Sequence, residues 1–234
     1  MRWSRTMIDD LRNRYWALLA KQHAPGAWEI LNAAYREAHR GYHSWDHIDD
    51  LLQKLDAFVH LATRPDLIAT AIFWHDAVYA TRVEDGGLRP DFDNVHDSAA
   101  LYCRHTLSNE TDAAAVCDMI MATADHLDAK AAGELYPGFS QDLDLFLDLD
   151  LSSLAAPWER FAENLDKIRF EYSWVPEIQF SHGRLKMLRT FLDRGDRLFR
   201  LDETRALWSP EARANLMRCI GELRAQIARL SPPA

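Results

Sequence analysis

Histidine is concentrated in one part of the chain, and helical spacing turns several of these side chains inward. Eight of the ten histidines lie between positions 39 and 126. His47 precedes two leucines by four and eight residues, which places it on an apolar helix face. His75 continues another apolar stripe, and Asp76 lies four residues after Ile72. His126 ends a third stripe, so three predicted helices direct imidazole or carboxylate groups towards the core.

These residue types together suit a divalent metal ion. An ionised Asp76 facing an apolar interior costs several kcal/mol unless a cation or strong donors accompany it. Imidazole with carboxylate is a ligand set for a divalent transition metal. The alternative is ordinary packing, because a lone inward histidine is usually a satisfied core residue. His43 and His47 have an i, i+4 spacing, but His43 precedes the predicted N-cap Ser44, and no zinc signature is present.

The elements that must position these residues are helices. Ala and Leu dominate the apolar residues, while Val and Ile are scarce and the 234 residues include only 9 Gly and 9 Pro. Ala and Leu are strong helix formers, whereas Val and Ile favour strands. We therefore expect an all-α fold, a single multi-helix bundle, and we exclude a β-sandwich, a collagen-like chain and a disordered linker.

Apolar periodicity and capping residues give the expected helix ranges. The longest apolar stretch, Leu67–Trp74, belongs to a helix that opens at Pro65 and runs to about Tyr79. The segment 142–151 alternates like a strand yet also has helical spacing, and its neighbours favour a helix. The predicted loops are 82–92, which could act as a lid, and 133–140. The other expected helices are 6–21, one from Pro25, one after Ser44, 93–107, 111–126, 158–172, 177–194 and 209–230.

Composition also bounds the partners and the location. A net charge of −9 argues against a nucleic-acid-binding surface, which needs basic residues to neutralise phosphates. No apolar stretch approaches the roughly 20 residues of a membrane helix, and the first residues have no signal-peptide core. Three widely spaced cysteines, Cys103, Cys117 and Cys219, predict reduced thiols rather than a disulfide frame or a cysteine zinc site. We expect a cytoplasmic protein.

The ordered set of these motifs resembles the HD superfamily of metal-dependent phosphohydrolases. That superfamily uses the order His, His-Asp, Asp to hold a divalent metal in an all-helical domain. Further segments resemble one bacterial family of predicted HD hydrolases across about residues 5–220. The matching segments are YHSWDHI (42–48), FWHDAVY (73–79), DNVHDSA (93–99), TADH (123–126), LDLDLSSL (147–154) and IRFEY (168–172).

The resemblance implies a ligand set and a domain layout. The metal ligands would be His47, His75, Asp76 and Asp148, with Asp150 as the rival for the last position, because the repeated sequence permits a slip of two residues. One domain would cover residues 1–234, with a metal-site core at about 40–155 and C-terminal helices at 157–231 packing on it. The metal could be Mn, Co, Ni, Fe, Zn or Mg.

Further residues would serve a second metal, proton transfer or the substrate. The candidates for a second metal or proton transfer are His96, His126, Asp93 and Asp97. The candidates for substrate binding are His43, Arg40, Arg169 and Arg184, of which the arginines could grip a phosphate bidentately. Val95 departs from the family pattern, in which an acidic residue follows the pair at positions 93 and 94.

The function that these residues imply is hydrolysis of a small phosphate ester or nucleotide by a metal-activated water. The expected partner is therefore a small phosphorylated substrate, with neither nucleic acid nor membrane. Two alternatives stay open. One is a metal- or ligand-binding protein that has lost turnover, for which Val95 is the best argument. The other is di-iron oxygenase chemistry, which would use His96 and His126 for a second iron.

Overall fold

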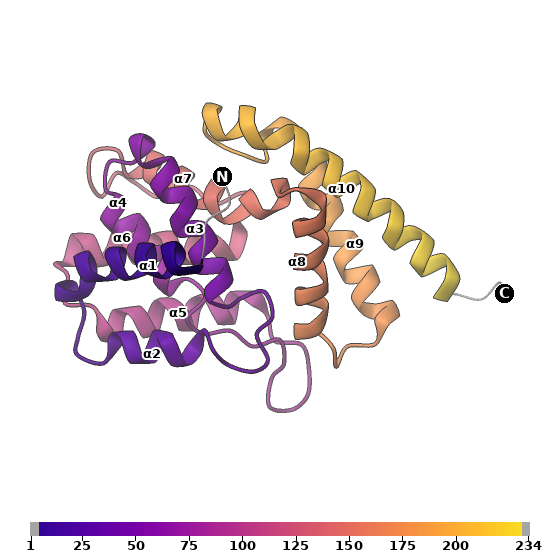
Figure 1. Ribbon diagram of the computed structural model, residues 1–234, viewed down its shortest axis with the longest axis horizontal. Coiled ribbons are helices and arrows are strands. Elements are labelled where there is room, and N and C mark those ends of the chain that lie inside the picture. The colour runs from indigo at the N-terminus through magenta and orange to yellow at the C-terminus, as the bar shows by residue number, and fades with distance from the viewer. Residues whose placement is uncertain (1–4, 231–234) are drawn as a thin grey trace. The chain divides into compact units, whose positions relative to one another are not determined.

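The computed structural model describes residues 5–230, and over that range the chain consists of α-helices joined by loops and short 3-10 helices (Figure 1). Strand pairing there is limited to two isolated bridges, His23 with Thr106 and Arg82 with Leu88. The predicted all-α fold is thus confirmed for the part of the chain that is described. None of the described helices is long and apolar enough to cross a lipid bilayer.

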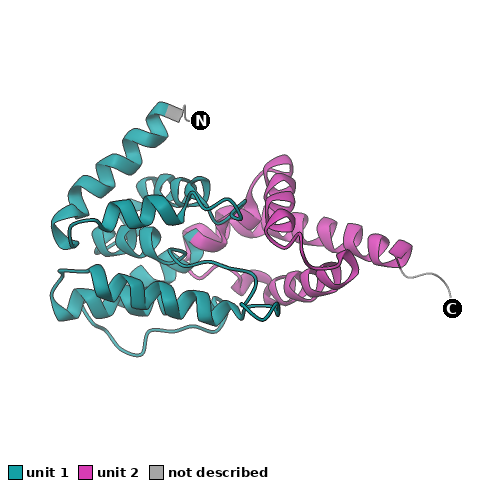
Figure 2. Ribbon diagram, turned by 90° about the horizontal axis from the view of Figure 1, so that it is seen from below, with its two compact units in different colours: residues 1–149 teal, residues 150–234 magenta. Residues whose placement is uncertain are grey.

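The chain divides into two compact units between Leu149 and Asp150, close to the end of one helix (Figure 2). The single domain expected over residues 1–234 stays a prediction, and its first four and last four residues lie outside the described range. The helices of the first unit are α1 (Arg5–Leu19), α2 (Ala27–Ala34), α3 (Trp45–Ala57), α4 (Pro65–Trp74), α5 (Asp91–His105), α6 (Glu110–Ala122) and α7 (Phe139–Leu151). Those of the second are α8 (Trp158–Glu171), α9 (Glu177–Arg194) and α10 (Asp202–Leu230).

Helix α4 is the central element of the first unit. Every residue from Leu67 to Trp74 is buried, and α1, α3, α5 and α6 all pack against this helix. A helix that is apolar on all sides needs such a complete cover, which explains why the longest apolar run of the sequence lies here. The Trp74 indole donates a hydrogen bond to Nε2 of His23 (3.0 Å), so its polar atom is satisfied inside the core.

The end of α4 differs from the sequence expectation, which continued the helix to about Tyr79. The helix ends at Trp74, with His75 as its C-cap residue. The following backbone is instead held by side chains. Asn94 accepts a hydrogen bond from the N–H of Ala80 and donates one to its carbonyl (3.0 and 2.9 Å). Such side-chain partners from elsewhere in the sequence replace the intrahelical bonds and end the helix early.

Helix α7 settles the ambiguous segment, because residues 139–151 are helical rather than extended. The turn before it requires glycine. Gly138 has φ 93°, and a Cβ atom there would overlap the side chain of Thr63. The chain therefore enters α7 in close contact with the residues that precede α4.

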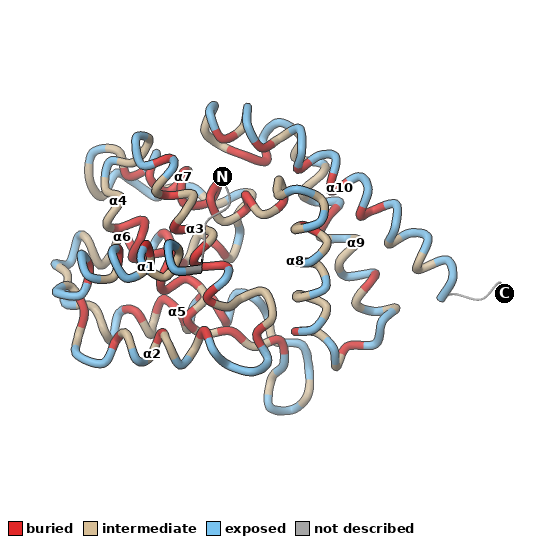
Figure 3. The backbone as a smooth tube through the Cα atoms, viewed as in Figure 1, coloured by how far each residue is buried: buried red, intermediate tan, exposed pale blue. Residues whose placement is uncertain are grey.

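In the second unit, α10 carries a buried stripe on one side. Figure 3 shows its red positions interrupted by exposed ones, and the buried residues are Thr204, Trp208, Ala212, Asn215, Leu216, Cys219 and Ile220. The expected start of this helix at Ser209 is wrong. The helix begins at Asp202 and continues through Pro210, although the proline cannot donate a backbone hydrogen bond.

Candidate metal site

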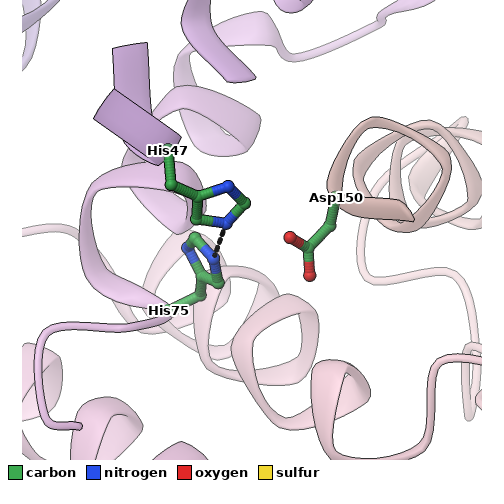
Figure 4. A group of neighbouring side chains, drawn as sticks. All are labelled: His47, His75 and Asp150. Carbon is green, nitrogen blue, oxygen red and sulfur yellow. Dashed lines mark hydrogen bonds between the residues drawn. The ribbon is translucent and has the colours of Figure 1, made fainter. Parts of the chain in front are cut away.

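His47 belongs to the first turn of α3. Ser44 is the N-cap residue, as predicted, and the apolar side of the helix continues from His47 into buried leucines. The His47 side chain is 4% exposed. Its ring lies tilted against that of Tyr42, with 4.9 Å between the centroids. The histidine therefore sits at the edge of the core with its Nε2 atom directed at His75 (Figure 4).

His75 is oriented by the end of α4. Its Nδ1 atom lies 2.9 Å from the carbonyl oxygen of Ile72. Because a carbonyl only accepts, this contact holds a proton on Nδ1, so Nε2 is the ring atom that can bind a metal ion once it has given up its own proton. Metal-binding histidines are commonly fixed in this way by a carbonyl behind the ring. The Nε2 atoms of His75 and His47 are 3.2 Å apart.

Asp76 lies beside the same two nitrogen atoms. Its Oδ2 atom is 3.1 Å from Nε2 of His75 and 3.6 Å from Nε2 of His47. Burial alone would raise the pKa of the Asp76 carboxyl, but the charges of neighbouring histidines, led by His75 and His43, outweigh it and hold that pKa well below its usual range. The site therefore keeps a carboxylate in a largely buried position and favours positive charge next to it.

The spacing of these three atoms fits a shared ion. Two nitrogen ligands at about 2.0–2.1 Å from one tetrahedral metal lie roughly 3.3–3.4 Å apart. The separations of 3.1, 3.2 and 3.6 Å between Nε2 of His47, Nε2 of His75 and Oδ2 of Asp76 lie around this value. Two imidazoles and a carboxylate held in this way suit a divalent ion of the zinc, iron or manganese kind.

A second carboxylate reaches the histidines from α7. Ligand atoms of His47, His75 and Asp150 all lie within 4.8 Å of one another, and Figure 4 shows the Asp150 carboxylate directed at the two rings. Asp150 is thus the aspartate of the repeated segment that joins this group. Asp148 does not belong to it. Two residues earlier in the helix, Asp148 lies about 200° further round the axis and is buried, with 1% of its surface exposed.

The register of α7 explains why Asp150 is the aspartate that lies near His47 and His75. Asp142, Phe146 and Asp150 recur every four residues and share one helix face. The Asp142 carboxylate accepts hydrogen bonds from two backbone N–H groups just before α4 (2.7 and 2.8 Å). The Phe146 ring meets that of His75 at 84°, with centroids 5.9 Å apart. One face of α7 therefore caps the start of α4 and brings a carboxylate to its end. Sequence reasoning missed Asp142 and Phe146, although this i, i+4, i+8 spacing was visible.

Arg40, expected to bind substrate phosphate, holds the backbone of the site instead. Its side chain is 1% exposed. It donates hydrogen bonds to the carbonyl oxygens of Asp76 (2.6 Å), Ala77 (3.1 Å) and His43 (3.3 Å), and it pairs with Glu37. The guanidinium thus fixes the segment that carries one predicted ligand and the segment that carries His43.

His43 lies next to the group. Its ring stacks on that of Tyr79, with centroids 3.9 Å apart, and its charge contributes to the low pKa of Asp76. Tyr42 packs against both His43 and His47. A third imidazole therefore lies beside the candidate ligands, and its expected role in substrate binding stays a prediction.

The structure brings none of the predicted second-site residues into this cluster, within the described range. Asp97 pairs with Arg89 and with His96, which is itself exposed. Burial by itself would raise the pKa of the Asp97 carboxyl, but the hydrogen bonds from Arg89 and His96 outweigh it and lower that pKa. Asp93 is exposed in the first turn of α5, and His126 is half-buried after α6. Val95 is buried in the core, 4% exposed.

The remaining predicted arginines are engaged within the second unit. Arg169 donates to the carbonyl oxygens of Tyr172 and Val175 and lies over the ring of Phe180 at 4.8 Å. Arg184 contacts the sulfur of Met187 at 3.7 Å. Their predicted role in phosphate binding stays a prediction.

Comparison with known proteins found no matching family model, no similar curated protein and no similar solved structure. The geometry of the cluster is therefore the main basis for a functional proposal.

Proposed function

We propose that this chain is a metal-dependent phosphohydrolase that cleaves a small phosphate ester or nucleotide, related in its ligand pattern to the HD superfamily. The observation that carries the proposal is the convergence of His47, His75, Asp76 and Asp150. They come from three separate segments, yet the carboxylates of Asp76 and Asp150 both lie close to the rings of His47 and His75. Four N and O ligands leave coordination positions open for water and substrate.

The residues that would hold the ion are these four. A divalent ion in such a set supplies Lewis acidity, which lowers the pKa of a coordinated water and withdraws charge from a phosphoryl oxygen. The protein keeps His75 in the tautomer that presents Nε2, through the carbonyl of Ile72. It also keeps Asp76 ionised beside the histidines, so that one ligand is ready at neutral pH.

Proton transfer falls to His43 in this proposal. The ring stands beside the Asp76 carboxylate and is oriented by its stack on Tyr79. A histidine oriented in this way can take a proton from the attacking water or give one to the leaving oxygen.

One observation favours the alternative of a metal-binding protein without turnover. Arg40 is the arginine closest in sequence to the site motif. Its guanidinium donates hydrogen bonds to backbone carbonyls and to Glu37 rather than facing a phosphate site. A hydrolase would then have to bind the phosphate through the metal and His43. No corresponding observation favours the di-iron oxygenase, since the cluster includes neither His96 nor His126.

The test combines metal analysis with a panel of phosphate esters and nucleotides. We expect the purified chain to retain a divalent ion or to take up Mn, Co or Ni, and to release phosphate from at least one substrate. His75→Ala and Asp76→Ala should abolish both properties. His182→Ala, an exposed histidine outside the cluster, serves as the matched control. Metal binding without turnover would support the non-catalytic alternative, and failure to bind any of these ions would refute both.

A further inference from the structure

Two of the three cysteines lie side by side on neighbouring helices. Cys103 is near the end of α5 and Cys117 is in the middle of α6, and these helices pack against each other across a short connection. The Sγ atoms are 2.7 Å apart. This separation is closer than unbonded sulfur atoms normally approach, and only a small movement separates it from the 2.03–2.05 Å of a disulfide bond. Sequence spacing alone does not reveal the pair, since thirteen residues intervene.

The two thiols differ in access. Cys103 is exposed, whereas Cys117 is half-buried. Burial raises the pKa of the Cys117 thiol, and its hydrogen bond with Cys103 raises it further. Cys117 therefore keeps its proton, and Cys103 is the sulfur that a reagent from solution meets first. Cys219 provides a contrast within the same chain, because it is buried without a cysteine neighbour and burial raises its pKa to about 11.

We propose that Cys103 and Cys117 form an oxidant-responsive dithiol that closes into an intramolecular disulfide between α5 and α6. The co-reactant is a peroxide. The Cys103 thiolate attacks one peroxide oxygen, the O–O bond breaks, and a sulfenic acid forms on Cys103 while the other oxygen leaves as water or alcohol. The Cys117 sulfur then attacks the Cys103 sulfur, the S–O bond breaks, and the second oxygen leaves as water. Two thiols lose two electrons and two protons, which balance the reduction of the peroxide.

The arrangement favours the second step over competing reactions. Both sulfur atoms are carried by helices that are already packed together, so ring closure needs little backbone movement. Holding two reacting groups in contact gives the intramolecular step a large advantage over attack by a thiol from solution. The cysteine pair is separate from the candidate metal site, whose proposed ligands are on α3, after α4 and on α7.

The experiment treats the reduced full-length chain with a small excess of hydrogen peroxide and counts thiols after denaturation. We expect the count to fall from three to one. Peptide mapping without reductant should show residues 103 and 117 joined, with the mass of two hydrogen atoms lost. Dithiothreitol should restore all three thiols.

Variants separate this pair from general oxidation. Cys219→Ser should still form the linkage, whereas Cys117→Ser should accumulate sulfenic acid on Cys103 that a dimedone probe captures. Circular dichroism on each variant confirms that the helices are intact. The proposal is overturned if the treated wild-type chain keeps Cys117 free to alkylate while Cys103 is overoxidised or links two chains together.

Discussion

Replacing Arg40 tests how the candidate metal site is held in shape. The buried guanidinium donates to the backbone carbonyls of Asp76, Ala77 and His43, and to the Glu37 carboxylate. Lysine at this position keeps the positive charge but has a single nitrogen, which cannot reach three carbonyls in two separate segments. Arg40→Lys therefore removes the shared support of the Asp76 and His43 segments and leaves every predicted ligand in place.

The expected magnitude follows from the acceptors left without a donor. Each buried carbonyl that loses its hydrogen bond costs about 1–3 kcal/mol. If lysine satisfies one of the three carbonyls, two are left without a donor, and Arg40→Lys should lower the free energy of unfolding by about 2–6 kcal/mol. Changes to residues that orient metal ligands typically weaken metal binding 10- to 100-fold, and we expect a loss within roughly this range.

The assay is a urea unfolding series on the metal-free protein, followed by a cobalt titration of the folded variant. Arg36→Lys, an exposed arginine on the same segment, is the matched control and should change stability by less than about 0.5 kcal/mol. If Arg40→Lys binds cobalt as tightly as the wild type and unfolds at the same urea concentration, the positioning role assigned to Arg40 is refuted.

Three further outcomes follow from the geometry. Asp150→Asn should weaken metal binding by about 10- to 100-fold with little change in the free energy of unfolding. Asp148→Asn should instead lower the free energy of unfolding by about 1–3 kcal/mol and leave metal binding unchanged. Equal metal affinities of the two variants would contradict the assignment of Asp150 as the ligand. Gly138→Ala should cost at least about 1–3 kcal/mol in a thermal melt, because of its positive φ and the overlap with a neighbouring side chain, whereas Gly133→Ala, with open space around it, should be nearly neutral. Burial raises the pKa of Tyr15 from 10.0 to about 12, so its contribution to stability is complete below pH 10 and is lost as pH rises through 12. Tyr15→Phe should therefore lose less stability than the wild type over that interval in urea unfolding, and an identical pH dependence would show that the raised pKa is absent.

Much of the fold was readable from the sequence because the helices bury periodic apolar stripes. The apolar run of α4 predicted a helix, and its lack of a polar side matches its place at the centre of the first unit. The end of α4 was not readable. It depends on Asn94 and on Arg40, whose partners are distant in the sequence. The start of α10 was misjudged because proline usually marks a first turn, yet Pro210 lies inside the helix.

The candidate site was partly readable for a related reason. Helical spacing identified His47 and His75 as inward residues, and both are buried in the structure. The family resemblance favoured Asp148 for the last ligand and kept Asp150 as its rival, because the repeated sequence permits a slip of two residues. The choice of Asp150 depends on contacts that the same face of α7 makes with α4, through Asp142 and Phe146. The role expected for Arg40 could not be judged either, because a lone arginine does not reveal which acceptors surround it.

The most direct test of the central claim is a crystal structure of the manganese- or cobalt-loaded protein, with anomalous diffraction recorded at the metal edge. We expect one strong peak at about 2.0–2.2 Å from Nε2 of His47 and Nε2 of His75, with carboxylate oxygens of Asp76 and Asp150 around it. A peak elsewhere in the chain, or none after loading, would contradict it.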